Sequence, residues 1–162
     1  MTLSQKIAAA VDADAGRDDR KPTPFRVEND QGRLTLSVIR ASAIGIESDR
    51  LEFVAPNSAE PLDAADLKPW ADRIAARVTY LMEPLVVLEI DRQELKAELR
   101  SQTPTPRDGR RSYYELILSR DGSAGLERVS FKESDRKRET VPFQLTREVL
   151  ERLVDDLVAC SP

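Results

Sequence analysis

The stretch LTLSV at residues 34–38 carries the pattern on which the fold prediction rests. Leu34, Leu36 and Val38 alternate with Thr35 and Ser37, which is the period of a strand with one buried face and one solvated face. The same alternation of apolar and polar residues returns at 51–53, 95–99, 114–118 and 141–145, and Leu126, Val129 and Phe131 belong to a further strand. Period-two patterning of this kind, interrupted by turn residues, predicts antiparallel strands.

Three other segments have the 3.6-residue period of amphipathic helices. They cover residues 2–11, 66–82 and 146–159. Trp70, the only tryptophan, is expected to anchor the second helix against the sheet, and Pro84 is expected to end that helix. The third helix has the broadest apolar face of the three.

Each half of the chain therefore consists of a β-meander followed by one amphipathic helix, over residues 25–82 and 85–160. We predict an α+β domain at 25–162, built on an antiparallel β-sheet with the amphipathic helices packed on one face. Residues 1–24 are predicted to form a short N-terminal helix and a proline-containing linker.

The run LVVLEI at residues 85–90 departs from strict alternation, because almost every residue in it is apolar. A run of this length predicts a strand that is buried on both faces. Tyr113 and Ile117 also face opposite to the main apolar set of their own strand. We therefore expect the second face of the sheet to be covered, either by the N-terminal helix or by another chain.

Several kinds of chemistry are excluded by residues that the chain lacks. It contains no histidine and one cysteine, so neither a Ser-His-Asp triad nor a Cys/His zinc site can form within it. Its 6 glycines form no phosphate loop and no dinucleotide fingerprint. A pair of catalytic carboxylates stays open, since the chain has 29 Asp and Glu residues. We expect a protein that is not an enzyme and that holds no cofactor and no metal.

The composition is that of a solvated globular protein, with 40% hydrophobic and 33% charged residues. The N-terminus has no apolar core of a secretory signal, and no run approaches the ~20 apolar residues that span a bilayer. A single cysteine fits a reducing compartment. These features predict a cytoplasmic protein with no membrane partner.

The expected order of helix, strands, helix, strands and helix in a small acidic protein is similar to that of type III secretion chaperones. Those proteins are dimers that bind extended segments of client proteins. The similarity lies in the element order, and the second half of this chain holds more strands. It implies a protein-interaction module, adaptor or chaperone-like, whose partner is another protein chain, either a second copy or a client.

A second function class is suggested by RDGRRSYYE at residues 107–115, in a chain whose net charge is −4. If the strands of the second meander pair in chain order, loops 102–111 and 132–138 lie at the same end of the sheet. That end would gather Arg107, Arg110, Arg111, Tyr113, Lys132, Arg136, Lys137 and Arg138, with Asp108, Glu133, Asp135 and Glu139 at its margins. Two solvated hairpin ends are the ordinary explanation. The alternative is a surface that binds nucleic acid or a phosphate ligand.

Overall fold

The computed structural model describes residues 1–16, 18–56, 60–101 and 107–162, and for residues 18–20 it describes only the backbone. Three helices and nine strands lie within these residues, and together they form an α+β fold. The helices are α1 (Leu3–Ala13), α2 (Ala64–Arg77) and α3 (Arg147–Ala159). The strands are β1 (Asp18–Asn29), β2 (Gly32–Ala41), β3 (Gly45–Val54), β4 (Leu85–Asp91), β5 (Lys96–Ser101), β6 (Arg110–Ser119), β7 (Ser123–Lys132), β8 (Lys137–Val141) and β9 (Phe143–Thr146).

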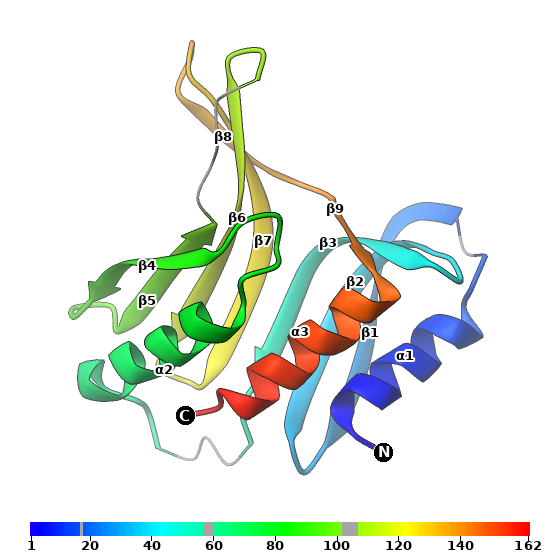
Figure 1. Cartoon of the computed structure of the whole chain (residues 1–162), viewed down its shortest axis with the longest axis horizontal. Helices are drawn as coiled ribbons and strands as arrows, with labels where there is room; N and C mark the ends of the chain where they lie inside the picture. Colours follow the sequence, from blue (N-terminus) through cyan, green and yellow to red (C-terminus); the bar gives the residue numbers. More distant parts are fainter. Residues whose placement is uncertain (17, 57–59, 102–106) are drawn as a thin grey trace.

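The strands pair antiparallel in the order β1-β2-β3-β7-β6-β5-β4. Strands β4 to β8 pair with their neighbours in chain order, which confirms the predicted meander. The last expected strand is divided at Pro142: β8 pairs with β7, whereas β9 pairs with β3. Figure 1 shows β9 running from the end of β8 back toward β3. The chain from β8 to β9 therefore ties the two halves of the sheet together.

One lateral row of aliphatic side chains crosses six strands of the sheet. Residues that lie opposite each other on paired strands have side chains on the same face, so the row can be followed from strand to strand. Its members are Leu36 of β2, Leu51 of β3, Leu126 of β7, Leu116 of β6, Leu99 of β5 and Val87 of β4. The five leucines are buried. We call these residues the leucine row, and they form the sheet's side of the hydrophobic core.

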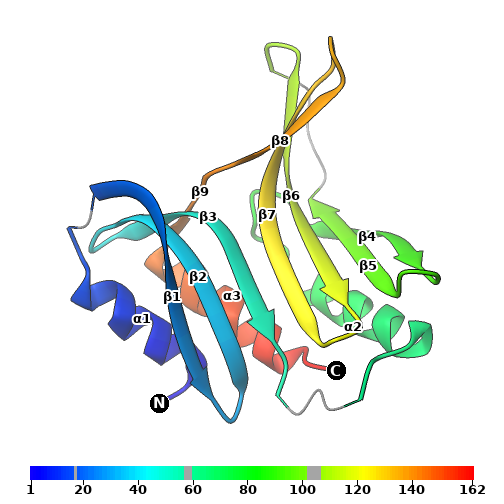
Figure 2. The same cartoon turned by 180° about the vertical axis from the view of Figure 1, so that it is seen from behind.

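The helices supply the other side of that core. In Figure 1 the three helices lie in front of the strands, and in Figure 2, seen from behind, the strands lie in front of the helices. Ile7 of α1, Trp70 of α2 and Leu153 of α3 belong to the same continuous cluster of buried residues as the leucine row. Trp70 is fully buried, which confirms its predicted role as a core anchor. No helix in the described part of the chain is long and apolar enough to cross a bilayer.

Strand β1 begins within the stretch that was expected to be a linker. Residues 18–24 lie in β1, and Pro24 lies opposite Ser37 of β2. Proline cannot donate to a strand ladder, but β1 is the outermost strand, where one side of the backbone needs no partner. Pro22 and Pro24 are compatible with this position for that reason.

Helix α2 begins earlier and ends earlier than the expected range of 66–82. Asp63 caps it in a capping box, in which the Asp63 carboxylate accepts from the N–H of Asp66 and the Asp66 carboxylate accepts from the N–H of Asp63. The helix ends at Arg77, yet Val78 and Leu81 beyond it stay buried. The apolar period therefore continues past the last helical residue.

We predict that Leu51→Ala lowers the free energy of unfolding by about 3 kcal/mol, because it opens a cavity in the centre of the leucine row. Urea denaturation measures the change. Ile44→Ala is the matched control, since it removes the same number of carbon atoms from a side chain that is 82% exposed. It should change the stability by less than about 0.5 kcal/mol. Equal losses in the two variants would show that the row is not the core.

Candidate functional site

The face of the sheet opposite the leucine row carries charged side chains. Glu127 of β7 lies opposite Glu115 of β6, and Glu115 lies opposite Arg100 of β5. Arg50 of β3 forms an ion pair with Glu127. The Arg100 guanidinium contacts Glu115, with 3.4 Å between Nε and Oε2. These ion pairs occupy the face that was expected to need a cover.

That expectation is corrected by the position of α1. In Figures 1 and 2, α1 lies on the same side of the sheet as α2 and α3, away from the charged face. Tyr113 is only 8% exposed, and the Arg100 guanidinium lies 4.7 Å from the centre of its ring. In the described residues, arginine side chains therefore take the place of the expected N-terminal helix at this point of the second face.

A hollow of about 220 Å³ lies on the charged face, and Arg50, Lys96, Glu115 and Glu127 are among its lining residues. It brings two carboxylates together, as a carboxylate-based active site requires. Both carboxylates already have arginine partners, since Glu127 pairs with Arg50 and Glu115 pairs with Arg100 and Arg138. The arrangement favours a structural ion-pair network over general acid–base chemistry.

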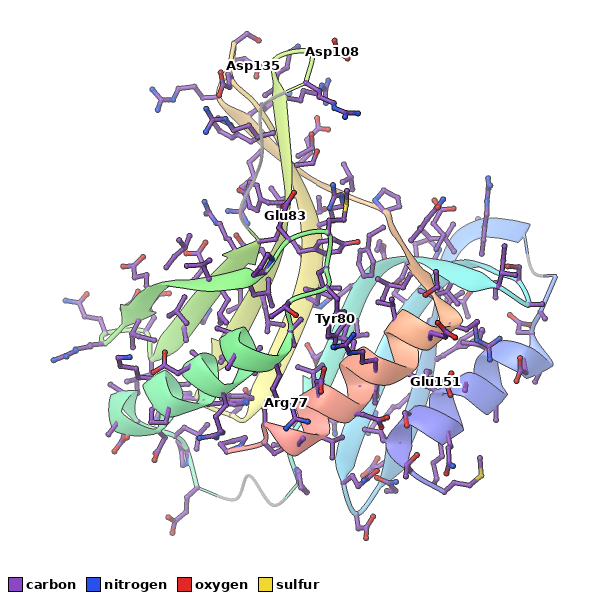
Figure 3. All side chains as sticks on the ribbon, in the orientation of Figure 1. Arg77, Tyr80, Glu83, Asp108, Asp135 and Glu151 are labelled. Carbon is purple, nitrogen blue, oxygen red and sulfur yellow. The ribbon has the colours of Figure 1, made fainter. Side chains whose placement is uncertain are left out.

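The start of β6, the end of β7 and the start of β8 extend beyond the rest of the sheet as a projecting arm, which stands at the top of Figures 1 and 2. We define the arm as residues 107–112 and 130–139. Its first turn is a two-residue hairpin turn, with positive φ at Asp108 (53°) and Gly109 (70°). The N–H of Glu133 donates to the carbonyl of Gly109 at 3.1 Å. This bond holds the two tips together, and Figure 3 shows Asp108 and Asp135 at this end of the molecule.

The arm brings together all seven cations of the predicted anion-binding surface, and all seven are exposed. The strand register divides five of them between its two faces. Arg110, Lys132 and Lys137 lie opposite one another on three adjacent strands; we call them the cation row. Arg111 and Arg138 flank Phe131 in the next row, on the other face. Arg107 forms an antiparallel bridge with Arg110 just before the first turn, and Arg136 lies in the second turn.

The cations of the two faces differ in their partners. Arg111 contacts Glu133, with 2.7 Å between Nε and Oε1, and Arg138 forms an ion pair with Glu115. Burial of Arg138 works against its charged form, yet the hydrogen bond and the charge of Glu115 raise its pKa above the ordinary arginine value. Within the described residues, no ion pair joins a carboxylate to any member of the cation row. The charge of that row is therefore free to meet a ligand, as is the charge of Arg107 and Arg136 beside it.

Tyr113 does not share the exposure of the arginines around it. Its ring is buried and covered by Arg100, as described above. Tyr114 is also buried, with the Arg128 guanidinium 4.8 Å from the centre of its ring. Neither ring presents an open face on which a base could stack, so the geometry does not support Tyr113 or Tyr114 as a stacking surface.

A second candidate surface, which the sequence did not reveal, lies along β4. The prediction that 85–90 is buried on both faces is wrong, because β4 stands at the end of the strand order and, among the described residues, pairs with β5 alone. The register of this pair shifts between Val87 and Glu89, and Leu88 at the shift is 53% exposed. Met82, just before the strand, is 74% exposed. The apolar run therefore marks a sheet edge and not a sheet centre.

The edges of the sheet are protected to different degrees. Unpaired sheet edges invite association with other strands, and proteins protect them with prolines and charged side chains. At the opposite edge, β1 carries Pro22 and Pro24. The outer strand of the arm, β8, begins with Lys137 and Arg138. Strand β4 carries no proline and is aliphatic over 85–88, and its protection consists of the register shift at Leu88 and the charged residues Glu89 and Asp91.

Helices α2 and α3 are joined by a group of polar side chains that lies between them. Asp156 of α3 is buried and accepts from the Nε of Arg77 at 3.1 Å and from the hydroxyl of Tyr80 at 2.6 Å. Burial and, after it, the hydrogen bond to Asp156 raise the pKa of Tyr80. Figure 3 shows Arg77 and Tyr80 in the space between the two helices. Their contacts fix the segment that leads from α2 into β4.

No family model, no curated protein and no solved structure matches this chain. The candidate surfaces therefore rest on the geometry of the chain itself.

We predict that Glu115→Gln lowers the free energy of unfolding by about 1–3 kcal/mol, because it removes the buried carboxylate that Arg100 and Arg138 share. Chemical denaturation gives the value. The control, Glu139→Gln, makes the same change at an exposed arm residue and should stay within about 0.5 kcal/mol of the parent protein. An unchanged stability in Glu115→Gln would mean that Glu115 does not hold the arm to the sheet.

Proposed function

We propose that this chain is a non-enzymatic protein-interaction module that associates with a second copy of itself along β4. The observation that carries the proposal is the aliphatic, proline-free edge strand of the sheet, where Leu88 is exposed. A strand in this position presents N–H and C=O groups that a further strand can pair with. Burial of Leu88 and Met82 in the contact would add a hydrophobic contribution.

The sequence of β4 is compatible with its own copy in an antiparallel arrangement. With Leu88 on the two-fold axis, Leu88 meets Leu88 of the second copy and Val86 meets Ile90. Glu89 then lies opposite Val87, and Asp91 lies opposite Leu85. No two carboxylates of the strand oppose each other in this register, and like charges directly opposite would be destabilising. The strand is thus self-complementary in charge as well as in apolar character.

This self-complementarity favours a second copy over an unrelated client chain. Two-fold dimers are the commonest soluble oligomers, and in them each subunit contributes the same surface. Pairing β4 with β4 would protect both exposed edges in a single contact. A client strand would protect only the edge of the chain that binds it.

We predict that light scattering on the parent protein gives twice the monomer mass of 18.2 kDa, and that Leu88→Lys gives the monomer mass. A lysine at this position places a charge at the edge, which opposes strand pairing. Leu88 is already half-exposed in the monomer, so the substitution should leave the fold intact, and circular dichroism verifies this.

Ile44→Lys is the matched control, because it adds the same charge at an exposed aliphatic residue that lies outside β4. This variant should remain a dimer. The proposal fails if the parent protein is a monomer at every concentration, if Leu88→Lys remains a dimer, or if Ile44→Lys dissociates equally.

A further inference from the structure

The cation row is a regular array of three positive charges. Arg110, Lys132 and Lys137 lie directly opposite one another on β6, β7 and β8, so their side chains leave the same face of the arm. Adjacent strands are about 4.8 Å apart, which places the outer two backbones of the row roughly 10 Å apart. All three residues are exposed. Three exposed, unpaired cations on a twisted but hydrogen-bonded ribbon form a surface whose spacing is fixed before any ligand binds.

Charge is segregated between the arm and the remainder of the molecule. The arm contains seven Lys and Arg residues and four Asp and Glu residues, which gives it a net charge of +3. The whole chain has a net charge of −4, so the other residues together carry −7. An anionic ligand is therefore attracted to the arm and repelled by the rest of the chain. Because the remainder of the chain is negative, the contact area of an anionic ligand is limited to the arm.

The surroundings of the cation row favour phosphate over a protein or a membrane. The next row on the same face consists of Ser112, Ser130 and Glu139, which are all polar. Protein interfaces have an apolar or aromatic centre in which lysine is depleted, and no such centre adjoins the row among the described residues. The tip carries Asp108 and Asp135, whereas a membrane-binding surface needs apolar side chains that enter the lipid. A ligand recognised by charge and spacing alone fits this surface best.

We propose that the arm binds the phosphate backbone of a nucleic acid through Arg110, Lys132 and Lys137. The major groove is about 12 Å wide and admits a two-stranded ribbon. The arm has three strands and their side chains, so it lies across the backbone and not within the groove. Contacts of this kind position a nucleic acid without reading its bases. Binding through the row is therefore independent of sequence and strongly dependent on salt.

The test is fluorescence anisotropy with two labelled DNA probes of mixed sequence, a short duplex and a single strand of the same length, over a range of salt concentrations. Three phosphate contacts predict a slope of about −2.7 in log K against log salt for the duplex and about −2.1 for the single strand. Arg110→Ala should reduce the slope by about 1, and the variant with Arg110, Lys132 and Lys137 all changed to Ala should lose the salt-dependent binding. Two duplexes of unrelated sequence should bind equally.

The matched control replaces three exposed cations outside the arm by alanine, namely Lys21, Arg92 and Arg120. It makes the same change in net charge, and it should lose far less affinity than the arm variant because the cation row is intact. The proposal is overturned if the parent protein shows no salt-dependent binding, or if the control variant loses as much affinity as the arm variant. It is also overturned if poly-L-glutamate displaces the labelled duplex as effectively as unlabelled duplex does at equal charge concentration. That result would assign the arm to acidic proteins.

Discussion

The structure depends on the register that brings five leucines and a valine into one row across six strands. The same register places Arg50, Glu127, Glu115 and Arg100 on the opposite face, where they form ion pairs. A slip of one residue in any strand would turn its charged side chains into the core and its leucine into water. Burying an unpaired charge costs much free energy, so the apolar face and the charged face of the sheet favour the same strand register.

The arm follows from how the sheet divides beyond this row. Strand β3 pairs with β7 over 51–54 and with β9 over 45–48, so the ladder between β3 and β7 ends at Leu126. Strand β8 takes that place beside β7. None of the described helices covers the arm, and exposed charged residues occupy it.

The sequence correctly predicted those strands and helices whose pattern of apolar residues is compatible with only one kind of element. Period-two alternation led to the meander of β5 to β8, and meander order in turn predicted that the seven cations lie at one end. The sequence pattern could not locate the end of α2, because Val78 and Leu81 are buried beyond the helix and prolong its apolar period. An extended segment with Pro22 and Pro24 is equally compatible with a linker and with an edge strand. The aliphatic run at 85–90 is compatible with a strand at the edge of the sheet and with one at its centre. Only the pairing order of the strands distinguishes the two positions. The face on which each arm cation lies depends on the register, which the pattern does not contain.

The seam between β3 and β7 has a kinetic consequence. It pairs Leu51 with Leu126 and Val54 with Ser123, which are remote in the chain, whereas most other ladders join neighbouring strands. Closing such a long loop costs conformational entropy before any contact compensates for it. Local hairpins on either side of the seam can form while the seam is still open. We therefore expect its closure to limit the rate at which the sheet is completed, and a nascent chain to hold β1 to β3 folded on themselves until β7 has been synthesised.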